Sequence, residues 1–442
     1  MSQLDLLADL IGRAKAAGAD AADAVLLSGT SVAVQRRLGR TEQLERSEAR
    51  DLGLRVFVGG RSAIVSSSAA DPAGFAALAE RAVAMARVVP EDPYGGLSEQ
   101  AAEPGPAELD LDDPAEPDAA ALIARASVAE DAALAVAGVT NSEGAEASYG
   151  RTEMALMTSA GFAGRYSRTT HSVSAVALAG AGTDMQRDYD VSTAVHLADL
   201  EDAAGIGHTA GTRAVARMNP RRPRTVRLPV VYDPRVSNSL LNHLATAING
   251  AAIVRGTSFL KDMLGQAMFA EAVQVHDDPR RPRGLRSKPF DAEGVPTAAR
   301  AIVQDGVLTT WLLDSRSARQ LGLRSTGHAV RGTGGPPSPS PTNLFMAPGA
   351  LSPTALMADI REGLYVTELI GMGVNGVTGD YSRGAAGFMI RDGVLAEPVA
   401  EITIAGSLPA MFRELTPADD LVLRRGTDAP TVRIEGMTLA GA

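Results

Sequence analysis

The residues best suited to hold a metal or to move a proton near neutral pH are the histidines, and the chain has six of them. They are His171, His196, His208, His243, His276 and His328. None belongs to a His-Glu-x-x-His or His-x-x-x-His pair, the spacings that place two imidazoles on one face of a helix. This pattern favours structural histidines over metal ligands.

Two histidines have neighbours that bear on this interpretation. His243 lies in an apolar helical stretch with no acidic residue in register, so we expect a surface position or a hydrogen-bonded structural role. His276-Asp277-Asp278 could chelate a cation weakly, but Pro279-Arg280-Arg281 follows and favours a solvated turn. Neither is expected to form a catalytic centre.

Other catalytic signatures are missing or incomplete. Cysteine is absent, which excludes disulfides, thiolate nucleophiles and zinc sites with sulfur ligands. No G-x-S-x-G elbow and no G-x-x-x-x-G-K phosphate loop occurs. Residues 371–376 match the dinucleotide motif G-x-G-x-x-G, but residues 378–384 are turn formers where that motif needs a helix. These glycines instead predict tight turns or close approach to an extended peptide.

The composition describes an ordinary globular protein. Of 442 residues, 45% are hydrophobic and 21% charged, and this length predicts two domains, 1–220 and 221–442. The net charge of −10 argues against direct nucleic-acid binding, which requires a basic surface. Asp5 and Asp9 stand where a signal peptide would be basic, and no apolar run approaches the ~20 residues that span a bilayer. We therefore expect a cytoplasmic protein without a membrane partner.

Hydrophobic periodicity in the first half predicts an α+β unit that occurs twice. The predicted helices cover residues 3–17, 72–89, 118–137 and 201–217. The predicted strands cover residues 24–27, 31–34, 52–58, 61–65, 146–158, 170–180 and 190–198, and Gly59-Gly60 marks a hairpin. The repeated order of helix, strands and helix suggests duplication. Residues 90–117 are rich in Pro, Gly and acids and predict an exposed loop.

The second half begins after a stiff, solvated link at residues 219–224. A strand at 226–232 leads to a helix at 236–250, whose apolar residues recur at helical spacing. Ser237 is a candidate N-cap, and Gly250 could end this helix in a left-handed conformation. The remaining sequence is strand-rich, with short helices expected at 316–321 and from Ser352 to about 362.

The helix at 236–250 and the run Arg255-Gly256-Thr257-Ser258 that follows it resemble the central motif of the TldD/TldE (PmbA) family. Its members were long described as modulators of DNA gyrase and are understood as cytoplasmic metallopeptidases. The similarity is dense from about residue 228 to 442. Its further motifs are residues 291–297, 341–344, 347–349, 375–388 and 401–408. The resemblance implies an α+β protein with a strand-rich, metallopeptidase-like second domain.

In the catalytic TldD branch the central helix reads His-Glu-x-x-x-His. Alignment on Gly250 and the Gly256-Thr257-Ser258 run places Leu241 and Thr246 at the two histidines and Asn242 at the glutamate. That branch takes its third ligand from a cysteine near the C-terminus, which this chain lacks. The resemblance therefore places the chain in the TldE branch, whose helix carries no metal, and implies no cofactor and no catalytic residue here.

The resemblance further implies a subunit that pairs with a zinc-bearing, TldD-type metallopeptidase. Such a pair encloses a chamber that trims unfolded or extended peptides, and this chain would complete the chamber and bind the substrate. The candidate residues for lining it are Asn242, Asn249, Arg255, Ser382 and Arg383. Ordinary hydrogen bonding in a helix or turn is an equally good interpretation of each.

Two other classes of function remain open at this stage. One is a homodimeric protein that binds peptides without cleaving them. The other is a regulatory factor that acts on DNA gyrase or on a toxin–antitoxin component. A co-purifying chain with an intact His-Glu-x-x-x-His helix would favour the peptidase subunit over both.

Overall fold

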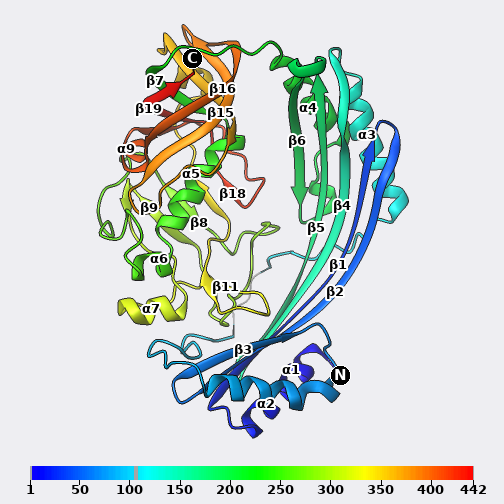
Figure 1. The fold of residues 1–442 in the computed structure, drawn as a ribbon, viewed down its shortest axis with the longest axis vertical. Helices are drawn as coiled ribbons and strands as arrows, with labels where there is room; N and C mark the ends of the chain where they lie inside the picture. The colour runs from blue at the N-terminus through cyan, green and yellow to red at the C-terminus, as the bar shows by residue number, and fades with distance from the viewer. Residues whose placement is uncertain (1, 104–107, 442) are drawn as a thin grey trace.

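The computed structural model describes residues 2–103 and 108–441 (Figure 1). The first half of the chain forms a long, curved sheet with helices on one side, and the second half forms a more compact, strand-rich body beside it. The chain is thus α+β, as the sequence predicts. None of its helices within the described ranges is long and apolar enough to cross a membrane.

The first sheet is antiparallel and has the order β3-β2-β1-β4-β5-β6. Its strands are β1 (Ala21–Arg37), β2 (Arg40–Val58), β3 (Arg61–Ser67), β4 (Val139–Thr158), β5 (Ala163–Ala179) and β6 (Gln186–Ala194). Its helices are α1 (Gln3–Ala16), α2 (Phe75–Ala86), α3 (Ala119–Leu134) and α4 (Ala203–Ala216). The predicted hairpin at Gly59-Gly60 is confirmed, since both glycines have positive φ, 55° and 75°, as a tight β-turn of this kind requires.

The first half repeats one element order, as its pattern suggested. A helix, three strands and a helix run from α1 to α2, and the same order runs from α3 to α4. The two units join through their first strands, because β1 pairs with β4 from Asp23↔Thr158 to Arg36↔Ala145. The result is a single six-stranded sheet in which β3 and β6 form the edges.

Helices cover one face of this sheet in two groups (Figure 1). α1 and α2 bury Leu52, Leu54 and Val56 of β2, whereas the alanine-rich α3 and α4 bury Val173 and Ala175 of β5. Small residues allow the second pair of helices to approach closely, which suits a chain with only 4% aromatic residues. The opposite face, at the end that carries β3, meets the second half of the chain.

The second half contains two sheets and a short ribbon. The larger sheet comprises β16 (Val394–Ser407), β15 (Asp380–Arg391), β14 (Glu362–Ile370), β7 (Val226–Tyr232), β19 (Val432–Ala440) and β17 (Leu415–Pro417), in that order. A further pairing of β16 with β19 closes it into a barrel-like structure. The smaller sheet comprises β10 (Val307–Leu308), β9 (Arg300–Gln304), β8 (Val275–Asp277), β13 (Leu344–Met346) and β18 (Thr427–Asp428). β11 (Ala329–Val330) pairs with β12 (Ser338–Pro339).

Short helices accompany these strands, and all but one of them contribute to one large core. The exception contributes Met357 to a smaller cluster with Val231, Ile360 and Ile390. The helices are α5 (Pro234–Ala247), α6 (Gly250–Val254), α7 (Ser315–Leu321), α8 (Pro353–Met357) and α9 (Leu408–Arg413). The core runs from Leu228 to Leu439 and includes the buried face of α5. Ser352 caps α8 as predicted, but α8 ends at Met357 because the chain must already enter β14 at Glu362.

One prediction about loops is right only in part, and another is wrong. Residues 90–117 contain no helix or strand within their described part, but they are docked: Leu109, Leu111 and Asp113 are buried, and Arg319 of α7 donates to the Tyr94 carbonyl at 3.1 Å. Residues 276–278 belong to strand β8 and its end, where buried Asp277 accepts a hydrogen bond from the Thr342 backbone at 2.7 Å. Amino-acid composition shows only that these segments are polar. The groups that bind them lie far away in the sequence, so composition does not predict their burial.

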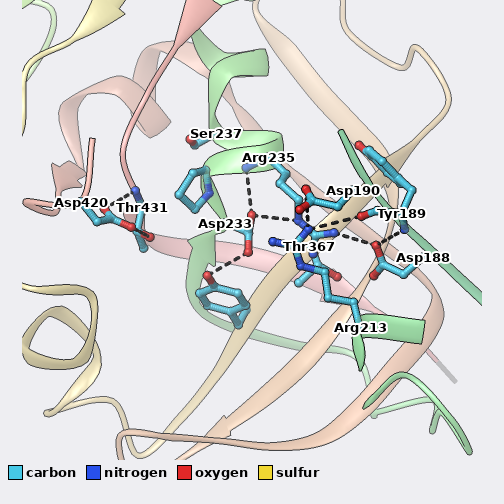
Figure 2. Close-up of polar contacts among 12 residues, drawn as sticks. Asp188, Tyr189, Asp190, Arg213, Asp233, Arg235, Ser237, Thr367, Asp420 and Thr431 are labelled. Atoms are coloured by element: carbon cyan, nitrogen blue, oxygen red, sulfur yellow. Dashed lines mark hydrogen bonds and ion pairs between the residues drawn. The ribbon is translucent and has the colours of Figure 1, made fainter. Parts of the chain in front are cut away.

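Buried ion pairs hold the two halves together near the first residues of α5 (Figure 2). Arg235 of α5 donates to Asp188 of β6 at 2.7 Å and to Asp233 at 3.1 Å. Asp188 also faces Arg217, which follows α4 and reaches Glu368 of β14. The side chains of Asp188 and Arg235 are only 3% and 7% exposed, so this junction is sequestered from solvent.

Candidate functional site

The N-cap of helix α5 is a different residue from the one predicted. Asp233, not Ser237, is the N-cap, and its carboxylate accepts from the Arg235 amide at 2.8 Å while Pro234 opens the helix. Ser237 lies inside the helix, fully buried, and donates to the Ala429 carbonyl. A search for serine caps therefore misses the N-terminus of this helix, which Asp233 and Pro234 mark.

Gly250 opens α6 and does not end α5. Its amide donates to the Leu312 carbonyl at 2.8 Å, and a Cβ built on it would lie 2.5 Å from the Ser317 hydroxyl and 2.7 Å from Leu313. Glycine is therefore required here for close packing against α7 and the residues before it. Asn249 caps α6, because its side chain accepts from the Ala251 amide at 3.0 Å.

The three α5 positions that correspond to the catalytic motif offer no suitable metal donors. Leu241 has no donor atom and is 1% exposed in the core. Asn242 is exposed, and the Thr246 hydroxyl is occupied in donating to the Asn242 carbonyl at 2.9 Å. Zinc prefers imidazole, thiolate or carboxylate, so these residues do not fit a zinc ion. Throughout residues 2–103 and 108–441, no group of three or more His, Asp or Glu side chains could hold a metal.

His243, the one imidazole on α5, faces strand β15 of the barrel-like sheet. Its ring packs edge-on against Tyr381, with centroids 5.9 Å apart, and its buried Nε2 has no partner among the described residues. Burial, and then repulsion by the nearby Arg383 guanidinium, lowers the pKa of His243 to about 4. The prediction of a surface or hydrogen-bonded histidine is thus wrong, and the ring is a neutral packing element at pH 7.

The glycine-rich residues after β14 form a hairpin connection to β15. Asn375 organises this connection. Its side-chain oxygen accepts from the Val377 backbone amide at 2.9 Å, and its backbone amide donates to the Asp380 carbonyl at 2.9 Å. Strand β15, and not a helix, follows the G-x-G-x-x-G match, so the match lacks the helix that the dinucleotide motif requires. The Phe259 amide donates to the Gly376 carbonyl at 3.1 Å and ties this connection to the segment after α6.

A cleft of about 470 Å³ lies where the first sheet meets α6 and α7. Its walls come from β2 and β3, from residues 92–96, from the end of α6, from α7 and from residues 336–339. Of the predicted residues, Arg255 lines the cleft directly. Asn249 supports one wall, because its Nδ2 donates to the Pro339 carbonyl at 2.7 Å. Arg255 is exposed and free to meet a ligand.

The floor of the cleft carries a buried carboxyl group, Glu293. Its carboxylate accepts from the Ser315 amide at 2.7 Å, and the residue is 4% exposed. Burial, with repulsion from Asp291, raises the pKa of Glu293 to about 7. Arg55 lies across the cleft and is paired with Asp23 at 2.5 Å. A carboxyl group that titrates near neutrality in a cleft is a common feature of functional sites.

The structure divides the five predicted residues between two places. Asn249 and Arg255 flank α6 at the cleft, whereas Ser382 and Arg383 lie on β15, where Arg383 is close to His243 of α5. Asn242, Ser382 and Arg383 do not line the cleft. The sequence reading missed Glu293, Arg55, Asp314 and Arg316. Only Glu293 had a signal, since it lies in the family-like turn at 291–297.

Three family profiles match the chain in order. A "PmbA/TldA metallopeptidase domain 1" profile matches residues 22–86. The corresponding central-domain profile matches residues 112–218, and the C-terminal-domain profile matches residues 225–441. Together they cover the first sheet, helices α2, α3 and α4, and the strand-rich half.

Relatives and solved structures agree with these matches. Metalloprotease PmbA of Escherichia coli O157:H7 is 36% identical over 426 residues, which are 96% of this chain and 92% of that protein. A PmbA homologue of Haemophilus influenzae is 34% identical and covers 96% and 93% of the two chains. A candidate modulator of DNA gyrase from Bacteroides thetaiotaomicron superposes with a TM-score of 0.90 at 25% identity, over 99% and 98% of the chains. TldE of Thermococcus kodakarensis, at 19% identity, shares the fold with a TM-score of 0.88 over 99% of this chain and 100% of TldE.

Proposed function

The chain belongs to the PmbA/TldD metallopeptidase family, and from this premise we propose that it is the metal-free, substrate-binding subunit of a peptide-degrading assembly. A TldD-type partner carries the zinc ion in this proposal. A zinc ion on that partner would supply the activation of the attacking water, and the residues of this chain would take no part in that step. The role of this chain is to complete the chamber around the substrate and to hold an extended peptide in place.

The donor set on α5 carries the proposal. Leu241 is part of the hydrophobic core, and Asn242 and Thr246 offer an amide and a hydroxyl where a zinc site needs imidazole or carboxylate. Asn242 also cannot take a proton from a water molecule as a carboxylate can.

The cleft beside α6 supports a role in peptide binding. Arg255 offers a cation that can bind a peptide carboxylate or carbonyl, and Asp314 and Asp92 offer acceptors on the same walls. Asp314 is held by its cap to the Ser317 amide at 2.8 Å, and Asp92 by Arg316 at 2.7 Å. Fixed polar groups around an open cleft suit a flexible peptide, because the protein loses little conformational entropy on binding.

Affinity purification from the source organism, followed by mass spectrometry, tests the proposal. We expect a co-purifying chain with an intact His-Glu-x-x-x-His helix, zinc in the complex, and peptide cleavage that neither chain shows alone. A stable homodimer that binds peptides without such a partner would replace the proposal with a peptide-binding protein. Specific capture of DNA gyrase or of a toxin–antitoxin component would instead support a regulatory factor.

A paired substitution tests the contribution of the cleft. Arg255→Gln should raise the KM of the complex for peptides several-fold with little change in kcat, because Arg255 binds substrate and takes no part in the chemistry. Arg81→Gln, at an exposed arginine of α2 outside the cleft, is the matched control and should leave both constants unchanged. Equal effects of the two substitutions would remove Arg255 from the binding site.

A further inference from the structure

A second cavity, of about 380 Å³, lies between the first sheet and the second half of the chain and is lined by cations. Arg168 comes from β5, Arg286 and Lys288 from the connection between β8 and β9, and Arg331 from the residue after β11. No aspartate or glutamate lines the cavity. None of these residues contributes to the cleft beside α6, so the cavity is independent of the proposed peptide site.

The positive charges in this cavity are poorly neutralised. Within residues 2–103 and 108–441, Arg168, Arg286 and Lys288 have no carboxylate within 4.0 Å. Arg331 pairs with Asp23 at 2.5 Å, but Asp23 is shared with Arg55. Lys288 and the Arg331 side chain are buried, Arg168 is half-buried and Arg286 is exposed, and the only carboxylate in direct contact with these four cations among the described residues is the shared Asp23. Buried charges, by contrast, are normally paired.

The nearest acids are committed to other partners. Asp291 accepts from the backbone amides of Glu293, Val295 and Ala329. Asp277 accepts from the Thr342 amide at 2.7 Å and faces His328. Both act on Lys288 through space, yet neither forms an ion pair with it. The local excess of positive charge is therefore set by the fold, because the nearest carboxylates are already bound to other groups.

Several donors in the cavity walls also lack acceptors. Nε and Nη2 of Arg331 and Nε of Arg168 are buried without a hydrogen-bond partner in the described part of the chain. The Arg331 side chain is only 3% exposed. Burial lowers the pKa of Arg168, Lys288 and Arg331, so holding these groups charged costs free energy in the absence of an anion. An anionic ligand would recover that free energy.

We propose that this cavity binds a doubly charged oxyanion, either inorganic phosphate or the phosphoryl group of a small metabolite. Guanidinium groups match phosphate oxygens with paired donors, and an ammonium group adds a point charge. The hydroxyl groups of Tyr166 and Ser340 lie on the same walls and can donate to the remaining oxygens. A single carboxylate would leave most of the charge excess in place, so the dianion fits better.

The bound anion joins the two halves of the molecule. Arg168 and Tyr166 belong to the first sheet, and Arg286, Lys288 and Arg331 belong to the second half. Across this boundary, Arg168 donates a hydrogen bond to the Ser287 carbonyl. Phosphate would therefore add charge-assisted contacts across this boundary and raise the thermal stability of the whole chain by mass action.

Isothermal titration calorimetry of the full chain with inorganic phosphate, glycerol phosphate and acetate, at constant ionic strength, tests the proposal. We expect saturable binding of one phosphate or phosphate ester per chain, a matching rise in Tm, and no saturable binding of acetate. The tighter of the two phosphate ligands identifies the source of the phosphoryl group. No saturable heat with either, or equal binding of acetate, would overturn the proposal.

Substitutions place the site in this cavity. Arg168→Gln should weaken phosphate binding about ten-fold or more, the effect of removing a charge-assisted hydrogen bond. Arg165→Gln, at an exposed arginine on the same strand but outside the cavity, should change the Kd less than two-fold. Tyr166→Phe keeps the ring contact with Phe290, at 5.4 Å, and should weaken binding less than Arg168→Gln does. Binding that survives both cavity substitutions unchanged would place the anion elsewhere and refute the assignment.

Discussion

Glu293 shows how a single residue can set the electrostatics of the cleft beside α6. Its carboxyl group is almost fully buried, faces Arg55 across the cleft and is repelled by Asp291. The cost of burying the charge exceeds these attractions and hydrogen bonds, so the pKa rises to about 7. The neutral and charged forms therefore coexist near physiological pH, and the cleft changes its net charge there.

This shift predicts a pH dependence of stability that Glu293→Gln removes. In the unfolded chain a glutamate titrates near 4.3, so between about pH 4.5 and 7 the native state holds more protons than the unfolded state. The free energy of unfolding should then fall as the pH rises through this window, by up to about 3 kcal/mol from this group. Urea unfolding at pH 5 and pH 8 should show Glu293→Gln gaining about that amount relative to the original chain at pH 8.

Glu45→Gln is the matched control, because Glu45 is exposed on β2. Its difference from the original chain should stay the same at both pH values. A constant difference for Glu293→Gln as well would mean that the carboxyl group is not held in a low-dielectric environment, and the cleft would lose its titratable group.

At the scale of elements, features set by the local sequence were predicted correctly, whereas features set by residues far away in the sequence were not. The Gly59-Gly60 hairpin, the repeated helix–strand–helix order and the strand at Val226–Tyr232 follow from periodicity and turn chemistry, which act over a few residues. The apolar face of α5 was predictable for the same reason. Its N-cap was not, since Ser237 fits the local rule but faces Ala429, 192 residues away. The prediction of an exposed loop at residues 90–117 missed their docking for the same reason, because that docking depends on α7.

The candidate site shows the same division. Arg255 was predicted from its motif and lines the cleft, and Asn249 supports it. Glu293 and Arg55 meet only because β2 and the turn at 291–297 are brought together by the tertiary fold, which one sequence does not reveal. The predicted substrate-binding roles of all five residues, Asn242, Asn249, Arg255, Ser382 and Arg383, remain predictions.

The junction of β6 with α5 predicts a large effect from one carboxylate (Figure 2). Asp188 is 3% exposed and faces both Arg235 and Arg217, so Asp188→Ala leaves two sequestered guanidinium groups without this partner. We expect the free energy of unfolding to fall by about 1.5–3 kcal/mol, since Arg235 keeps Asp233 and Arg217 keeps Glu368 as partners. Denaturant unfolding of the variant measures it.

Glu143→Ala provides the comparison for that junction. Glu143 pairs with Arg187 at 2.7 Å, but the two side chains are 46% and 45% exposed, and such pairs contribute about 0–1 kcal/mol. If Asp188→Ala costs no more than Glu143→Ala, then the two halves are held mainly by apolar contacts and the ion pairs are incidental.

At the scale of the whole molecule, the long sheet contacts the second half near each of its ends. Asp188 and Arg235 join them at one end, and Asp23 and Arg331 at the other. Between these contacts, Arg283 pairs with Asp110 at 2.6 Å and with Asp199 at 3.0 Å. An arrangement fixed at several points holds α5 in one orientation. In the proposed assembly, the metal donors that α5 lacks come from a TldD-type partner.

The last prediction follows from that dependence: restoring the catalytic motif within this chain should not create a peptidase. The variant is Leu241→His with Asn242→Glu and Thr246→His. Leu241 is buried in the core, so its replacement alone should cost about 2–5 kcal/mol. The chain has no cysteine to act as a third ligand. We expect no stoichiometric zinc by mass spectrometry and no chelator-sensitive cleavage of peptides, with Asn242→Glu alone as a folded control, since Asn242 is exposed. One zinc ion per chain together with cleavage by the variant alone would show that the fold still holds a complete site, and the need for a metal-bearing partner would disappear.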